Sequence, residues 1–293
     1  MYEQIASNKR KTYLLFFVFF LLLGIIGYVF GFVFWGNWIP GFTIAWIIAV
    51  VFGLISYYSG HKMILAMTNA KEAKKPKYTY LINTVEGLSI AAGLPMPKVY
   101  VIESQALNAF ASGRDPKNSI VCVTTGLIEK LNRQELEGVL AHELSHVKNY
   151  DIRTMMLAAT LVGVVAFISD IMLRSFIWGG GNRDNNKGNG ILMAVGIVLA
   201  ILAPLIASMI KLAISRKREY LADASGAMLT RYPKGLADAL RKISKDENVL
   251  KSASNATAHL FISSPFTRKK IIFSNLFSTH PPIEDRIKRL DQM

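Results

Sequence analysis

Two histidines and a glutamate lie close together in the segment HELSH, residues 142–146. On an α-helix, residues four positions apart lie one above the other, so His142 and His146 could bind the same metal ion. Glu143 could then take a proton from a metal-bound water while that water attacks a carbonyl carbon. The spacing therefore predicts a divalent metal site with hydrolytic chemistry. The competing interpretation is a solvated helix face that carries the same three residues.

A metal site of this kind needs a third protein ligand, and an acidic pair later in the chain could provide it. Glu219 and Asp223 are four positions apart in a segment, 215–230, whose pattern predicts a helix. We expect Glu219 to bind the metal and Asp223 to orient a histidine by accepting its second ring N–H. On its own such a pair is typical of a solvated helix face, so this prediction depends on HELSH. Two imidazoles and a carboxylate suit one zinc ion per chain, although other divalent ions accept the same donors.

The elements around HELSH form an α+β pattern that is mainly α. Asn132 and Glu135 have the spacing of a capping box, so a helix should begin there and continue through HELSH. Further helices are expected over residues 78–92, 234–244 and 282–292. Residues 98–103 alternate as a strand, and 107–113 and 119–126 flank the turn signal RDPKN. The sequence therefore predicts a zincin-like domain with a small antiparallel sheet.

Four long apolar blocks explain why 52% of the residues are hydrophobic. They cover about residues 13–34, 39–58, 154–173 and 190–214, and each is long enough to cross a bilayer. We expect one transmembrane hairpin in residues 1–58 and a second in 154–214, with residues 59–153 and 215–293 forming one domain. A cleaved signal peptide is the alternative for the first block. Buried helices of the domain are the alternative for the last two, since Asp170 and Pro204 interrupt them.

The basic residues indicate the orientation of the chain, which carries a net charge of +14. Three Lys or Arg residues precede the first block and eleven lie between His61 and Asp151, whereas the short loop after the first block has none. By the positive-inside rule, both termini and the site should face the cytoplasm of a multi-pass protein in the cell membrane. A basic stripe with interleaved aromatics is lacking, which argues against nucleic-acid binding. The single cysteine, Cys122, excludes an internal disulfide.

Four motifs give the chain a family resemblance. They are NAFASG from Asn108, HELSHVKNYD from His142, SRKREYLADASGA from Ser215 and STHPPIEDRI from Ser278. With the alternation of membrane hairpins, they resemble HtpX-type membrane metalloproteases, relatives of the CAAX prenyl-protein endopeptidases, over nearly the whole chain. The resemblance implies a gluzincin-type zinc endopeptidase that acts in the quality control of membrane proteins, often under heat or envelope stress. It assigns zinc to His142, His146 and Glu219 and the role of general base to Glu143.

One further segment could bind substrate. Residues 107–112 could form an edge strand that pairs with an extended polypeptide through its backbone, with Asn108, Ala109 and Phe110 at the cleft. An ordinary core strand is the alternative interpretation of the same residues.

Two residues near the C-terminus could serve the site. The resemblance suggests that His280 donates a hydrogen bond to the oxyanion formed at the scissile carbonyl, although a lone histidine is usually structural. We expect Arg286 to pair with a carboxylate of the site.

Together these features predict a protease of membrane polypeptides that is embedded in the lipid bilayer. They leave open whether it forms homo-oligomers or binds other quality-control proteins. A transporter or channel is the alternative from another class, with Asp170 and Pro204 lining a pathway. A scaffold that retains the fold without activity is a third, which the intact Glu143 argues against.

Overall fold

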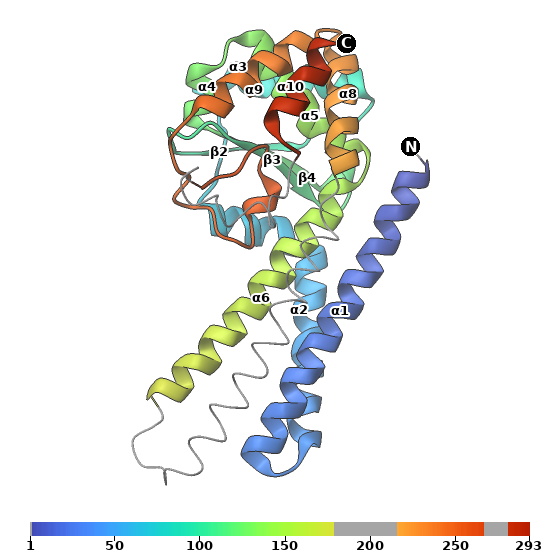
Figure 1. Ribbon diagram of the computed structural model, residues 1–293, viewed down its shortest axis with the longest axis vertical. Helices are drawn as coiled ribbons and strands as arrows, with labels where there is room; N and C mark the ends of the chain where they lie inside the picture. Colours follow the sequence, from blue (N-terminus) through green and yellow to red (C-terminus); the bar gives the residue numbers. More distant parts are fainter. Residues whose placement is uncertain (1, 179–215, 267–280) are drawn as a thin grey trace.

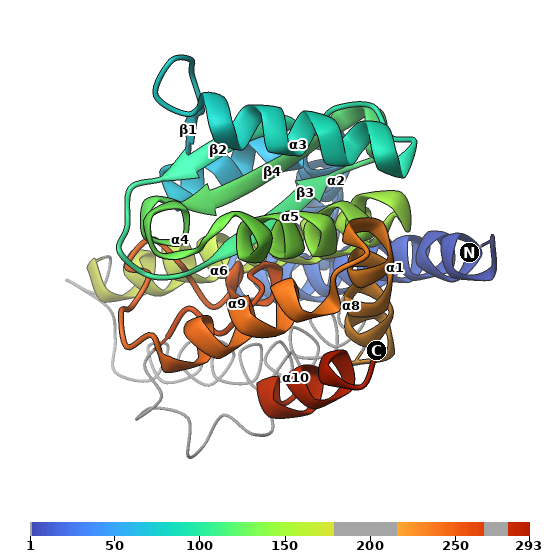
Figure 2. The same cartoon turned by 90° about the horizontal axis from the view of Figure 1, so that it is seen from above.

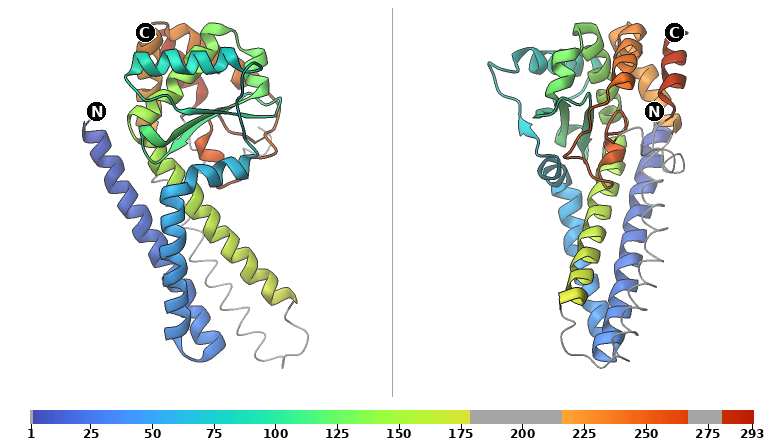
Figure 3. Two further views of the ribbon diagram at one scale, coloured as in Figure 1. Left: turned by 180° about the vertical axis from the view of Figure 1, so that it is seen from behind. Right: turned by 60° about the vertical axis from the view of Figure 1, so that its left-hand side comes forward.

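Among the described helices, three long ones project from one end of an α+β domain (Figure 1). The computed structural model describes residues 2–178, 216–266 and 281–293. The projecting helices are α1 (Tyr2–Trp35), α2 (Trp38–Thr68) and α6 (Asp151–Trp178). Seen from behind and from the side, they extend away from the domain in the same general direction (Figure 3). The end of α1 that carries the N-terminus lies on the domain's side of this bundle.

The first two helices form the expected N-terminal hairpin. Within the described residues, two segments are long and apolar enough to cross a membrane, Ala6–Phe32 and Trp38–Thr68. The helices approach closely where glycines meet, since a Cβ added to Gly27 would lie 2.5 Å from the carbonyl oxygen of Gly41. Small residues that allow such approach are typical of helix packing in membranes.

The second predicted hairpin is described only in part. Helices α5 (Arg133–Lys148) and α6 qualify as a third span if the two are counted together, although they are bent by 85°. Helix α5 packs against the sheet and against α8 (Arg216–Thr230) and α9 (Pro233–Lys245) inside the domain, so α6 is the part of this pair that could enter a membrane. The fourth predicted segment, 190–214, lies outside the described residues. Of the four spans that the sequence predicted, the described residues thus contain two candidates, or three with the bent pair.

The sheet has four strands in the order β1-β2-β4-β3. They are β1 (Lys71–Glu72), β2 (Lys98–Ile102), β3 (Ala109–Gly113) and β4 (Ser119–Thr124). The expected hairpin is present, with β3 antiparallel to β4. The prediction of a purely antiparallel sheet was wrong, because β2 pairs with β4 in parallel, and the sheet is mixed. After β2 the chain crosses to the far edge of the sheet, where it forms β3. The alternation of side chains predicts that a segment is a strand, but it does not predict which strand pairs with it.

Each face of the sheet packs on a different set of helices. One face lies against α3 (Thr79–Ala92) and α5, and the other contributes to a core that includes the domain ends of α2 and α6. In the view from above, α3 and α5 lie close to the strands (Figure 2). The first face presents Val99, Val101, Val121 and Val123, and the second presents Ile102, Phe110, Ile120 and Cys122. The ends of α2 and α6 that lie next to the domain are therefore part of its core.

The remaining helices lie near the positions that the sequence predicts. Helix α9 (Pro233–Lys245) and helix α10 (Ile283–Asp291) match two of them, and α4 (Thr125–Lys130) is an additional short helix. Helix α3 ends at Gly93, whose φ of 66° is left-handed, as expected for a glycine cap. Asn132 and Glu135 form the predicted capping box at the start of α5, with hydrogen bonds of 3.0 and 2.7 Å. This cap fixes the first turn of the helix that carries HELSH.

Candidate metal centre

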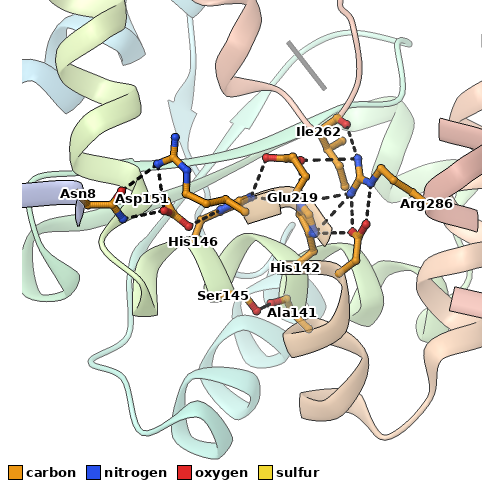
Figure 4. A network of polar contacts seen from close by, with 11 residues as sticks. Asn8, Ala141, His142, Ser145, His146, Asp151, Glu219, Ile262 and Arg286 are labelled. Atoms are coloured by element: carbon orange, nitrogen blue, oxygen red, sulfur yellow. Dashed lines mark hydrogen bonds and ion pairs between the residues drawn. The ribbon is translucent and has the colours of Figure 1, made fainter. Parts of the chain in front are cut away.

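Three buried side chains from two helices meet at one point. His142 and His146 come from α5, and Glu219 comes from α8 (Arg216–Thr230). The two Nε2 atoms are 3.3 Å apart, and Glu219 places Oε1 3.6 Å from Nε2 of His146 and Oε2 3.9 Å from Nε2 of His142. One ligand atom from each of the three lies within 4.8 Å of the others. Figure 4 shows the three side chains facing one another.

In the neutral form that binds metal, the hydrogen bonds of the two histidines leave their Nε2 atoms as acceptors. Nδ1 of His142 donates to Oδ1 of Asp223 at 2.9 Å, and Nδ1 of His146 donates to Oδ2 of Asp151 at 3.1 Å. Because an ionised carboxylate only accepts, the ring proton of each neutral imidazole sits on Nδ1 and the Nε2 lone pair faces the other ring. Two nitrogens bound at 2.0–2.1 Å to a tetrahedral ion would be roughly 3.3–3.4 Å apart. The donor set therefore fits a divalent metal.

Negative charge gathers around these histidines. Burial lowers the pKa of His146, but the hydrogen bond to Asp151 and the charge of Glu219 outweigh burial and raise the pKa to about 9. The same excess of negative charge favours a cation between the three side chains, and the carboxylate partners make the imidazoles more basic ligands.

Asp223 and Arg286 form a buried ion pair beside the site. Arg286, on α10, donates from Nε and Nη2 to the two carboxylate oxygens of Asp223 at 2.9 and 2.7 Å. Its Nη1 donates to the carbonyl oxygen of Ile262 at 3.1 Å and lies 3.9 Å from Oε2 of Glu219. Burial would raise the pKa of Asp223, but Arg286 and the hydrogen bond with His142 hold that pKa well below its ordinary value. Asp223 thus stays ionised as the partner of His142, and Arg286 lies against a carboxylate of the site.

Asp151 is a site residue that the sequence reasoning missed. It follows His146 by five positions, and the chain turns at Tyr150, whose φ is 60°, between α5 and α6. This turn and the 85° bend bring the first residue of α6 back to the second histidine. Asp151 is the last residue of the motif HELSHVKNYD. Its contact with His146 could not be predicted, because it depends on the bend between α5 and α6, which the residue pattern does not reveal.

Glu143 is buried next to the two histidines. Burial raises its pKa, while the nearby His142 and His146 lower it and the backbone N–H of Ala111 in β3 donates a hydrogen bond to its carboxylate. A carboxyl whose pKa is raised by burial is better suited to accept a proton and return it. Because Ala111 donates this hydrogen bond, strand β3 fixes the position of the Glu143 side chain.

The predicted substrate edge lies beside the site but is covered. Strand β3 is at the edge of the sheet, and the carbonyl oxygen of Ala109 accepts a hydrogen bond of 3.0 Å from the backbone N–H of Ile262. The Asn108 side chain donates to the Ser263 carbonyl oxygen at 3.1 Å, and Phe110 packs edge-on against Phe261, with ring centroids 5.2 Å apart. Residues 261–263 thus occupy the edge that the sequence offers to a substrate. His280 lies outside the described residues.

Comparisons with known proteins agree with this geometry. A protein named protease HtpX homolog from Dictyoglomus turgidum is 48% identical over 292 residues, which cover 100% of this chain and 94% of that protein. Proteins of the same name from Thermoanaerobacter pseudethanolicus and Listeria monocytogenes serotype 4a are 48% and 45% identical over 298 and 304 residues. These alignments cover 100% of this chain and 98% and 100% of the relatives, respectively.

A solved structure shares the fold. The crystal structure of Ste24p from S. mikatae aligns with a TM-score of 0.51 and 19% identity over 99% of this chain and 67% of that chain. The family model described as peptidase family M48 matches residues 76–293, which include HELSH, Glu219 and Arg286. With this match over most of its length and protease relatives along all of it, the chain belongs to peptidase family M48.

Proposed function

We propose that this membrane metallopeptidase is a zinc endopeptidase that cuts misfolded or damaged membrane proteins at the cytoplasmic face of the cell membrane. In this proposal one zinc ion is bound by His142, His146 and Glu219. The observation that carries it is the convergence of these three buried donors, with both Nδ1 atoms committed to carboxylates and both Nε2 atoms facing inward. Relatives that match along the whole chain are named proteases, which supports peptide hydrolysis. The family resemblance of the four sequence motifs supports a role under stress.

The residues around the metal have distinct parts in this mechanism. Bound zinc would activate a water and polarise the scissile carbonyl. Glu143 accepts the proton of the attacking water and delivers it to the leaving amine. Asp223 and Asp151 hold the two imidazoles in the tautomer that binds metal. His280 remains our choice for a hydrogen-bond donor to the oxyanion, on the ground of the STHPP motif alone.

We propose that substrate binds at the edge of β3. The backbone groups of Ala109 and Ala111 point away from β4, since they contact Ile262 and Glu143 instead. An extended polypeptide that pairs with this edge would bring a peptide bond next to Glu143, and backbone pairing would need no particular side chains. At Ala109 the substrate would take the place of residues 261–263. Asn108, Ala109 and Phe110 are thus proposed to line the cleft once that segment has moved.

Removal of zinc is expected to abolish cleavage. A chelator should reduce hydrolysis of an unfolded protein such as casein to background, and one equivalent of zinc should restore it, because the proposed nucleophile is a water activated by the ion. Metal content measured on the purified full-length chain should be one zinc per chain. Cleavage that persists in metal-free protein, or a transport activity without cleavage, would favour one of the other function classes.

The orientation can be tested with single cysteines. Cys122 is completely buried, so a maleimide that cannot cross membranes should not react with the parent protein in intact cells. Asn37→Cys, between α1 and α2, should react from outside, whereas Glu86→Cys, on an exposed position of α3, should react only after lysis. The reverse labelling pattern would place the domain outside the cytoplasm and contradict the proposal.

A further inference from the structure

Asn8 is a buried polar side chain on the first membrane helix. It is 3% exposed and lies at the end of α1 that reaches the domain. Its Nδ2 donates to Oδ1 of Asp151 at 2.8 Å and to the carbonyl oxygen of Asn149 at 3.0 Å. Its Oδ1 accepts a hydrogen bond of 3.1 Å from Nη1 of Arg218. The amide therefore bonds to three residues that are distant from it in sequence.

Asp151 connects this amide to the metal centre. Its Oδ2 accepts the hydrogen bond from Nδ1 of His146, while its Oδ1 accepts those of Asn8 and of Arg218, the latter at 3.2 Å. One oxygen thus orients the histidine and the other is fixed by the two donors. Figure 4 shows this sequence of contacts from Asn8 through Asp151 to His146. Partners that orient a metal-binding histidine set the direction of its lone pair and so its affinity for the ion.

The contacts join three separate parts of the chain. Asn8 belongs to α1, Asp151 is the first residue of α6, and Arg218 directly precedes Glu219 in α8. Asn8 and Asp151 are 143 positions apart. The first membrane helix is therefore hydrogen-bonded to the segments that carry His146 and Glu219.

We infer that Asn8 is a positioning residue of the metal centre, through which the first membrane helix fixes the orientation of Asp151 and hence of His146. This inference rests on the zinc site proposed above. It goes beyond a role in attaching α1 to the domain, which would also explain a buried asparagine. The two roles differ in what they affect: attachment alone would change stability, whereas positioning changes the binding of metal by the folded protein.

The test uses the full-length chain in detergent or in lipid nanodiscs. Asn8→Leu keeps the branched shape of the side chain, with some added bulk, but removes all of its hydrogen bonds, and Asn8→Ala removes them without added bulk. Thr12→Val is the matched control, because Thr12 is buried one turn further along α1 and its hydroxyl donates to the backbone oxygen of Asn8, not to Asp151. For each protein the dissociation constant of zinc is measured by competition with a chelator, together with the thermal midpoint of the metal-free form and with kcat and KM.

For both Asn8 variants the dissociation constant of zinc should rise by about tenfold. This is the lower end of the loss in metal affinity that follows when a residue that orients a metal ligand is replaced. At saturating zinc, kcat should fall while KM stays near that of the parent, and Thr12→Val should leave zinc binding unchanged. A lower thermal midpoint with unchanged zinc affinity in both variants would overturn this inference alone. A parent protein that binds no zinc would instead overturn the proposed function. If Asn8→Leu does not fold, Asn8→Ala provides the same comparison.

Discussion

Glu143→Gln is expected to abolish peptide hydrolysis while one zinc ion remains bound. Glutamine keeps the shape of the side chain and an oxygen that can accept the hydrogen bond from Ala111, but it cannot take a proton from the attacking water. Loss of a general base lowers the rate by about 100-fold to 10,000-fold. Since burial disfavours the ionised carboxyl at this position, the neutral amide should also leave the thermal midpoint unchanged or higher. The measurements are the rate of casein cleavage, the zinc content and the thermal midpoint.

The control is the same substitution on the same helix. Glu137 lies on α5 and pairs with Arg133 at 2.9 Å on the surface, where such pairs contribute little to stability. Glu137→Gln should cleave at the rate of the parent. A Glu143→Gln protein that binds zinc and still cleaves as fast as Glu137→Gln would show that another group is the base.

The inactive variant also tests where substrate binds. If a bound peptide pairs with β3, the backbone N–H of Ile262 loses its acceptor at Ala109. Hydrogen exchange at Ile262 should then become faster when an uncleaved peptide is added to Glu143→Gln. Unchanged or slower exchange would show that residues 261–263 stay in place and that the substrate binds elsewhere.

Local spacing made the centre of the site predictable. His142 and His146 are one helical turn apart, and Asn132 with Glu135 sets the start of the helix, so both follow from short-range geometry. Glu219 could be proposed because a third ligand was needed and because a matching motif carries it. These residues require only that two helices meet, and the structure brings one ligand atom of each within 4.8 Å of the others.

The parts that the sequence did not reveal depend on contacts between distant backbones. Asp151 reaches His146 only because Tyr150 adopts a left-handed conformation and α6 turns away from α5. The parallel pairing of β2 with β4 and the cover of β3 by residues 261–263 use backbone hydrogen bonds, which place few demands on side-chain pattern. Asn8 precedes the first predicted membrane segment and adjoins its basic flank, where nothing local points to a site 143 positions away.

Gly226→Ala is expected to separate the third ligand from the first two. Gly226 follows Glu219 by seven positions, two helical turns, so the two lie on the same face of α8. A Cβ at this position would lie 2.9 Å from the backbone nitrogen of His142 and 3.2 Å from the carbonyl carbon of Ala141. Backbone atoms inside α5 cannot give way, so α8 must shift and carry Glu219 and Asp223 with it. Zinc affinity should fall by about 10-fold to 100-fold, and the free energy of unfolding by about 1–3 kcal/mol.

Two other glycines separate this effect from the general cost of an added methyl group. Gly87 is on α3 with open space around its Cβ position, so Gly87→Ala should leave zinc affinity unchanged and raise stability by about 0.5–1 kcal/mol. Gly138 is on α5 itself, where a Cβ would lie 2.7 Å from the backbone nitrogen of Leu236 in α9. Gly138→Ala should therefore destabilise the domain as Gly226→Ala does, but without moving α8. If Gly138→Ala and Gly226→Ala weakened zinc binding equally, the cause would be overpacking of α5. The close contact between α8 and α5 would then not explain how Glu219 is held at the metal centre.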